Sequence, residues 1–281
     1  MKTEYTNFEV KIIEATVNKR KQITTYQLKY PRFIHAELMT HRVFSRNASS
    51  SRAIPVKKTL SQVWNNPAMP VFWGANQAGM QASAALEGWK LSAAKFIWKL
   101  SAKVACCFAW MLVKLNLHKQ LANRILEPWQ HIHVILTTTE DENFYSLRRH
   151  KDAQPEFKFL ADMMWDAKSL YMARDVKDNE IKWANWHLPY VSVAEREQYD
   201  ISECIQMSAA RCARVSYLTH DGKVPSIEED KNLFTRLVGS APIHASPIEH
   251  AAYAASAPNK RSNNFVGWVQ FRETFEADAV I

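Results

Sequence analysis

The stretch THRVFSRNASSSRAIP, residues 40–55, is unusually dense in groups that bind anions. Its sixteen positions hold three arginines, one histidine, one asparagine and four serines, and they follow an apolar segment. Guanidinium groups make bidentate contacts with phosphate oxygens, and hydroxyl and amide groups add further hydrogen bonds. The composition therefore predicts an anion-binding segment, with a basic loop carrying a few helix caps as the alternative.

The composition of the whole chain is that of an ordinary globular protein. The 281 residues carry a formal charge of +8 and are 47% hydrophobic and 23% charged. Without a Gly/Ser-rich or Pro-rich linker, we expect one domain over residues 1–281. The basic residues are scattered rather than collected in a long run, so we expect small phosphorylated ligands and no nucleic-acid partner.

Cysteine usage and the most apolar segment bear on the compartment. The four cysteines form no CxxC pair and no signal peptide is evident, so we expect a cytoplasmic protein without disulfides. In residues 92–115, Lys95, Lys99 and Lys103 recur every four residues, which is typical of an amphipathic helix. We expect that helix to pack on a core, and we expect no membrane partner.

Residue patterns along the chain favour an α+β fold, with a mixed or antiparallel sheet and helices packed around it. Alternating and β-branched residues predict strands in 7–30 and 131–139. Capping-box spacing at Thr139/Glu142 and at Ser226/Glu229 predicts two helix starts. A polar stretch without a clear period predicts one long connection in 174–199. Periodic or Ala/Leu-rich stretches predict helices in 32–44, 76–125, 140–149, 155–171, 201–217, 226–238 and 263–276.

Three further clusters are weak signals when taken singly. Arg148 and Arg149 end a short helix, where cations are usually solvated. The pair His131 and His133 would share one face of a strand, but no further ligand cluster stands nearby, so we expect no metal site. The segment HASPIEH, residues 244–250, places a glutamate and a histidine at a Ser-Pro turn.

Together these segments resemble the flavin-dependent thymidylate synthases. The signature of that family, RHRxxSxNxxSxR, is similar to THRVFSRNASSSR, residues 40–52. A second family segment, an arginine before Leu-Pro followed by NFLNLRxxxxAQxE, is similar to NRILEP and NFYSLRRHKDAQPE, residues 143–156 for the latter. The resemblance covers most of the chain outside the long connection.

The order of the family's segments is rotated in this chain. In the family, the segments AARVSY and HTSPFEH precede the signature. In this chain the similar segments, AARCARVSY at residues 209–217 and HASPIEH, follow it. This suggests a circular permutation in which residues 174–199 join the old ends. Residues 32–42 and 265–274 both resemble the helix that leads into the signature, and such an overlap would be left by the rotation.

The resemblance implies transfer of a one-carbon unit from methylenetetrahydrofolate to carbon 5 of dUMP, with FAD as cofactor and NADPH as reductant. It implies catalytic roles for Arg148 and Asn143. It implies substrate binding by four residues: Glu37, Ser50, Arg52 and Arg124. It implies flavin binding by seven: His41, Arg42, Ser45, Asn47, His244, Ser246 and Glu249. It also implies a homotetramer whose sites are built from several subunits.

Departures from the family pattern leave alternatives open. The first signature arginine is Thr40, a glutamine is replaced by Glu37 and a glutamate by Ala48, while Arg272 is a candidate to replace the missing arginine. One alternative is a hydroxymethylase, or an enzyme that acts on dCMP, since a carboxylate accepts hydrogen bonds where a glutamine could also donate. The other is a non-catalytic nucleotide- or flavin-binding protein.

Overall fold

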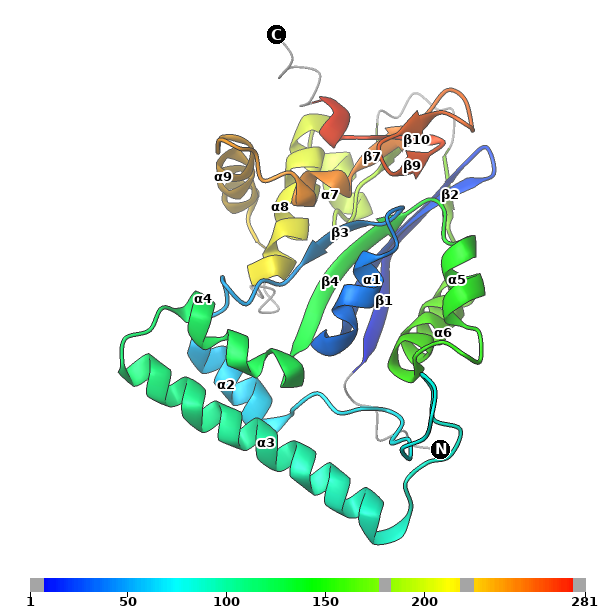
Figure 1. The fold of residues 1–281 in the computed structure, drawn as a ribbon. Helices are drawn as coiled ribbons and strands as arrows, with labels where there is room; N and C mark the ends of the chain where they lie inside the picture. Colours follow the sequence, from blue (N-terminus) through cyan, green and yellow to red (C-terminus); the bar gives the residue numbers. More distant parts are fainter. Residues whose placement is uncertain (1–7, 177–182, 218–224, 275–281) are drawn as a thin grey trace.

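The computed structural model describes residues 8–176, 183–217 and 225–274. Its main sheet has five strands in the order β3-β4-β2-β1-β5 (Figure 1). Three of the four neighbouring strand pairs are antiparallel, and the fourth pairs the short β5 parallel to β1. The strands are β1 Glu9–Asn18, β2 Lys21–Pro31, β3 Ser45–Ala48, β4 His131–Thr138 and β5 Arg174–Asp175.

The first two strands form the hairpin that the alternating sequence predicts. Lys19 and Arg20 connect them and both have positive φ, 45° and 70°. Two-residue connections of this kind match the right-handed twist of paired strands, although Asn and Gly are the usual residues there. Residues Tyr26, Leu28 and Tyr30 are fully buried, so the alternation marks the face of β2 that enters the core.

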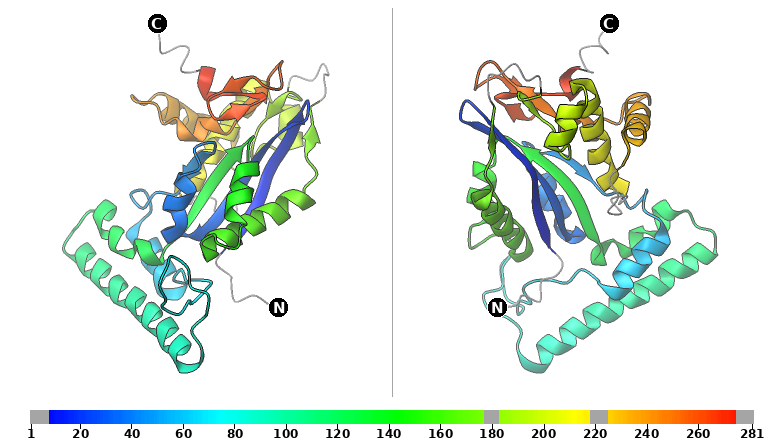
Figure 2. Two further views of the ribbon diagram at one scale, coloured as in Figure 1. Left: turned by 45° about the vertical axis from the view of Figure 1, so that its right-hand side comes forward. Right: turned by 180° about the vertical axis from the view of Figure 1, so that it is seen from behind.

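Helices cover both faces of this sheet (Figure 2). On one face, Phe144 of α5 and Phe157 and Leu160 of α6 join the core formed with β1, β2 and β4. On the other face, Cys212 and Val215 of α8 pack against Ile135 of β4. The helices and 3-10 turns are η1 Arg32–Ile34, α1 His35–Met39, α2 Val56–Asn65, α3 Gly88–Lys114, α4 Lys119–Ala122, η2 Arg124–Trp129, α5 Glu142–Arg148, α6 Pro155–Leu170, α7 Val193–Gln198, α8 Ile201–Tyr217, α9 Ile227–Val238 and η3 Ser246–Glu249.

Strands occupy the first part of 263–276, where a helix was expected, and only residues 272–274 of the described chain are helical. The strands in this region are β8 Arg261–Ser262, β9 Phe265–Val266 and β10 Trp268–Gln270, and β10 pairs with β7, Ala252–Ala254. Gly267 has φ +76°, and a Cβ there would lie 3.0 Å from the Pro258 carbonyl oxygen. Because the residues around this turn are buried on both sides, neither a helical nor an alternating period is visible in the sequence.

Three other expectations need correction. Within 76–125 the α-helices cover only residues 88–114 and 119–122, and α2, which precedes this stretch, was not expected. The Thr139 hydroxyl accepts a hydrogen bond from the Val266 amide rather than capping α5, whose N-cap is Asp141. The stretch 174–199 contains β5, β6 Trp186–His187 and α7, and the last is capped by a Ser192/Glu195 capping box.

The permutation hypothesis meets two tests in this fold. The segment AARCARVSY lies in α8, where Cys212 and Val215 pack against Ile135 of the sheet, as the hypothesis requires. The described ends, however, lie at opposite ends of β1, because Trp268 donates to the Lys21 carbonyl at the hairpin turn while Phe8 precedes the start of the strand (Figure 1). A strand of this length spans about 30 Å, which argues against a simple cutting and rejoining of adjacent ends.

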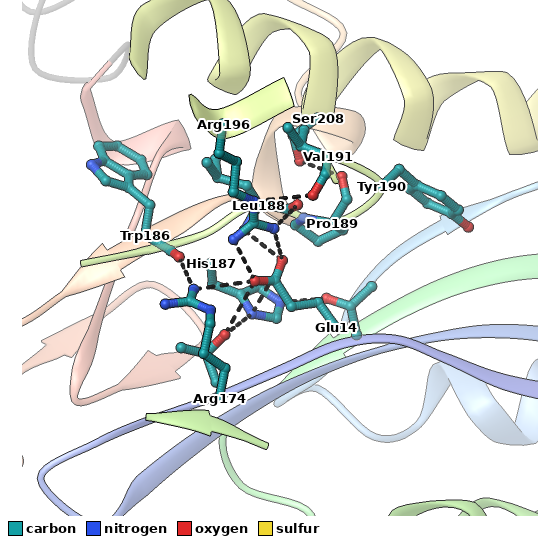
Figure 3. A network of polar contacts seen from close by, with 12 residues as sticks. Glu14, Arg174, Trp186, His187, Leu188, Pro189, Tyr190, Val191, Arg196 and Ser208 are labelled. Atoms are coloured by element: carbon teal, nitrogen blue, oxygen red, sulfur yellow. Dashed lines mark hydrogen bonds and ion pairs between the residues drawn. The ribbon is translucent and has the colours of Figure 1, made fainter. Parts of the chain in front are cut away.

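A buried ion cluster joins β1 to the segment that follows residue 183. The Glu14 carboxylate accepts hydrogen bonds from Arg196, from Arg174 and from the Leu188 amide, at 2.8–3.2 Å (Figure 3). Burial raises the pKa of Glu14, but His187 and the two arginines outweigh it and hold the pKa at about 2. The cluster therefore fastens the later half of the chain to the first strand.

Candidate functional site

Two cavities are lined by six of the thirteen residues proposed from the sequence. The first, here the Arg148 cavity, has a volume of about 1020 Å³ and lies between α6, the N-terminal half of α3 and the loop of residues 70–82. The second, here the Arg52 cavity, has a volume of about 480 Å³ and is lined by Asn47, Ala48, Ser50, Arg52, Ala53, His244 and Ser246. Residues far apart in sequence thus share a wall in each case.

Arg148 is held in place by the first residues of the signature segment. Its Nε donates to Nε2 of His41 at 2.9 Å, and one terminal nitrogen donates to the Thr40 hydroxyl at 3.3 Å. The guanidinium also lies over the Phe157 ring, 4.8 Å from its centroid. These contacts fix one edge of the group, while the side chain remains part of the cavity wall.

The electrostatics around Arg148 keep its neighbour neutral. Burial, together with the charges of Arg148 and Arg46, lowers the pKa of His41 to about 4. Neutral His41 can therefore accept the hydrogen bond from Arg148 at pH 7. Burial raises the pKa of Glu37, although Arg148, whose guanidinium lies 3.9 Å away, acts in the opposite direction.

The Arg52 cavity is built where β3 meets η3. The Ser246 hydroxyl donates to Oδ1 of Asn47 at 3.3 Å, and Nδ2 of Asn47 donates to the Cys212 carbonyl at 2.9 Å. This places the segment 244–250 beside the signature segment despite some 200 residues between them. Arg52 is exposed at the rim of the cavity, and its side chain has no carboxylate partner within the described part of the chain.

A buried glutamine that the sequence reading missed connects these segments. Gln270 on β10 donates to the Ser45 hydroxyl and to the Glu249 carbonyl, both at 2.9 Å. Arg272 pairs with the Glu249 carboxylate. The resemblance of residues 265–274 to the helix that leads into the signature was the one sequence signal for a role of this stretch in the site. The structure shows that Trp268–Gln270 form a strand and that its glutamine contacts Ser45.

Seven proposed residues do not line either cavity: Glu37, His41, Arg42, Ser45, Arg124, Asn143 and Glu249. Asn143 is exposed and sits about 140° around α5 from Arg148, since each residue turns a helix by about 100°. Arg42 is exposed, and Arg124 is exposed and pairs with Glu127 at 3.0 Å. Glu127 also accepts from the Ser51 hydroxyl, so Arg124 stands close to the end of the signature segment.

The donor set of the Arg52 cavity fits the polar part of a flavin dinucleotide. Hydroxyl, amide and guanidinium groups line it, from Ser50, Ser246, Asn47 and Arg52. The cavity is smaller than a whole dinucleotide, so a bound cofactor would extend beyond it. Within the described ranges, no three His, Cys, Asp or Glu residues gather as a metal site.

Comparison with known proteins gives structural similarities alone. No family model matches the chain, and no curated protein matches it. Similar solved structures include a nucleotide methylase and a thymidylate synthase. A UMP/dUMP methylase, PolB, from Streptomyces cacaoi bound with 5-Br UMP is 14% identical over 58% of this chain and 88% of that one, with a TM-score of 0.49.

Two further structures are similar at comparable levels. The same methylase bound with 5-Br dUMP is 17% identical over 53% of this chain and 66% of that one, with a TM-score of 0.44. Thymidylate Synthase X from Helicobacter pylori with FAD and dUMP is 17% identical over 52% of this chain and 67% of that one, with a TM-score of 0.38. At these scores the α+β assignment rests on the strands and helices themselves, and activity is a separate question.

Proposed function

We propose that this chain transfers a one-carbon unit from methylenetetrahydrofolate to carbon 5 of a deoxypyrimidine monophosphate, in the simplest case dUMP to dTMP, with FAD and NADPH. The observation that carries the proposal is the assembly of the motif segments in space. Arg148 contacts His41 and Thr40, and Ser246 contacts Asn47, although the chain order of these segments is not that of the family. We expect the reaction to take place in the cytoplasm.

In the proposed mechanism Arg148 activates the pyrimidine. Carbon 5 becomes nucleophilic when negative charge develops on the carbonyl edge of the ring, and a guanidinium aimed at that edge stabilises the charge without a covalent adduct. The contacts to His41 and Phe157 hold Arg148 before substrate arrives, so less reorganisation is needed in the transition state. Asn143 is proposed to orient a ligand near the same helix.

Binding of the anionic parts is assigned to the signature segment. Ser50, Arg52 and Arg124 are proposed to hold the nucleotide phosphate, with Glu37 at the pyrimidine. When bound, reduced flavin supplies the hydride that completes the methyl group. Seven residues are proposed to hold the flavin: His41, Arg42, Ser45, Asn47, His244, Ser246 and Glu249.

The division of these residues between two cavities is consistent with a site shared between subunits. Arg148 lines one cavity, whereas Ser50 and Arg52 line the other. A nucleotide whose ring contacts Arg148 of one chain could place its phosphate on Arg52 of another. We therefore propose a homotetramer, and sedimentation of a flavin-bound monomer would contradict this.

The cysteines favour this chemistry over the folate-dependent synthases that attack carbon 6 with a thiolate. Burial raises the pKa of Cys106 to about 11, and burial likewise raises the pKa values of Cys204 and Cys212. Protonated thiols are poor nucleophiles. No cysteine lines either cavity of the proposed site.

A second candidate acts on the cytosine nucleotide or leaves a hydroxymethyl group. Glu37 lies within 3.9 Å of Arg148, where a carboxylate could accept a hydrogen bond from the cytosine amino group. Ala48 in place of the family's glutamate, at the wall of the Arg52 cavity, is a further difference. The non-catalytic binding protein predicts bound nucleotide or flavin with no turnover.

One experiment separates these possibilities. Purified protein is incubated with FAD, NADPH, methylenetetrahydrofolate and either dUMP or dCMP, and the mass of the nucleotide product is measured by mass spectrometry. A gain of one methyl on dUMP supports the synthase. A hydroxymethyl gain, or reaction with dCMP alone, supports the second candidate, and bound nucleotide without any product supports the binding protein.

A further inference from the structure

The outer face of α3 is apolar along nearly its full length. The helix has 27 residues and runs along the outside of the molecule, with α2 and α4 on its inner side (Figures 1 and 2). Small residues, among them Ala102, Ala105 and Ala109, are buried on that inner side. Large apolar side chains instead point away from the protein and are 47–76% exposed: Trp89, Phe96, Ile97, Leu100, Phe108 and Met111.

The expectation that the helix in 92–115 packs on a core is met by its inner side alone, because its large apolar residues are exposed. Among the described residues, α3 is the one helix long and apolar enough to cross a bilayer by length and composition, yet only 17% of its most apolar window is buried. Its inner side contacts α2 and η2 through a packed cluster. A helix held along a folded domain in this way can lie on a membrane surface while keeping those contacts.

The charge around α3 is mostly positive. Residues 45–127 contain eleven lysines and arginines and two acidic residues, Glu87 and Glu127, so their formal charge of +9 exceeds the +8 of the whole chain. α3 itself carries Lys90, the three lysines at four-residue spacing and Lys114, and no acidic residue. Two copies of such a face would bring like charges together, whereas an anionic lipid surface complements it.

An apolar groove adjoins the exposed face. It lies between α2 and α3, has a volume of about 480 Å³, and is lined by Leu60, Trp64, Cys107, Trp110 and Met111 among others. The ammonium groups of Lys103 and Lys114 lie over the rings of Trp64 and Trp110, at 5.3 and 5.2 Å from the centroids. Aromatic rings with lysines at their edge are the groups that favour the boundary between headgroups and acyl chains.

From these observations we infer that α3 is a membrane-docking helix, whose outer face inserts among the acyl chains of an anionic bilayer while its lysines contact the headgroups. The inference does not depend on the proposed reaction. It concerns the full chain, because α3 is supported by α2 and η2. It predicts reversible association, since a single interfacial helix binds far more weakly than a membrane span.

The test uses the full-length protein and two kinds of large unilamellar vesicle, phosphatidylcholine alone and phosphatidylcholine with phosphatidylglycerol. Flotation should show binding to the anionic vesicles that weakens at raised salt, with a blue shift of tryptophan fluorescence. The double variant Phe96→Ser/Phe108→Ser should lower the partition constant by at least about tenfold, since each ring inserted contributes substantially. The matched control is Leu170→Ser/Met172→Ser, at positions 89% and 92% exposed on another part of the surface, which should bind as the parent does.

A second variant tests the charge. Lys99→Glu/Lys103→Glu keeps the apolar face and should bind anionic vesicles no better than neutral ones. Binding that is equal in the parent and the phenylalanine variant would overturn the inference, as would absence of binding to anionic vesicles. An oligomer that Phe96→Ser/Phe108→Ser dissociates, with no vesicle binding by the parent, would assign the face to a second copy instead. Circular dichroism verifies that each variant is folded.

Discussion

The arginines of this protein lie in two contrasting surroundings. Around Glu14 and Asp230, four arginines are paired with buried carboxylates at 2.8–3.2 Å: Arg174, Arg196, Arg211 and Arg214. In the signature segment, Arg42 and Arg52 are exposed with no carboxylate partner within the described ranges. Compensated charges of the first kind hold the fold together, whereas uncompensated ones are available to bind an anion.

The largest expected effect tests the compensated side of this comparison. Glu14→Gln leaves Arg174 and Arg196 buried or half-buried without their counter-ion, and loss of one partner of a buried pair typically costs about 3–5 kcal/mol. Urea denaturation should show the midpoint falling accordingly. The control is Glu9→Gln, whose exposed pair with Lys29 should change stability by less than about 1 kcal/mol. Equal midpoints for the two variants would show that the Glu14 cluster does not stabilise the fold.

The next prediction concerns Arg148, which belongs to neither group. Its hydrogen-bond partners, His41 and Thr40, are uncharged, and the Glu37 carboxylate lies 3.9 Å away. Arg148→Ala should lower turnover by about 10²–10³-fold, the usual effect of losing one electrostatic donor. Arg149→Ala is the matched control, since Arg149 is its neighbour in sequence but pairs with Asp162 at 2.8 Å. Folding of both variants is verified by thermal melts. A rate for Arg148→Ala equal to that of Arg149→Ala would remove Arg148 from the mechanism.

Arg52 tests the uncompensated side. Arg52→Ala should weaken nucleotide binding roughly ten- to hundredfold with little change in stability, because a charge-assisted contact to phosphate contributes about 1.5–3 kcal/mol. Calorimetric titration with dUMP measures this. Arg261→Ala, at an exposed position paired with Glu140, is the control and should leave binding unchanged. Loss of stability without loss of affinity would place Arg52 with the structural arginines.

A pH dependence of stability follows from the buried histidines. Burial is the main cause that lowers the pKa of His35, His131 and His187 to about 4 and that of His250 to about 3. Below pH 6.5 the unfolded chain binds protons that these folded imidazoles do not, so the free energy of unfolding should fall steadily between pH 6.5 and about 4. A flat profile over that range, measured by denaturant titration, would contradict the neutral buried state.

The smallest expected effect concerns the cysteines. Replacing all four by alanine should leave measurable turnover, with some loss of stability because Cys106, Cys204 and Cys212 are buried. Steady-state rates and a thermal melt distinguish the two effects. Complete loss of turnover in a folded variant would revive a thiolate mechanism.

Much of the fold was predictable because its elements carry local signals. The alternation of β2, the β-branched run of β4 and the Ser226/Glu229 capping box of α9 all appear in the structure where the sequence placed them. The residue types of the candidate site were equally visible, since an anion-binding segment needs arginines, hydroxyls and amides whatever its surroundings. Local geometry was sufficient for these because each depends on neighbours a few residues away.

The sequence by itself determined the strand and helix types with strong periods and the chemical character of the signature segment. Only the tertiary structure decided that Gln270 reaches Ser45, that Arg148 rests on His41, and that the apolar face of α3 points outward. The first two outcomes depend on contacts between segments about 100 residues or more apart. The third depends on the fact that no described helix or strand covers the outer face of α3. Such contacts are selected by packing and burial of the whole chain, and no local period records them.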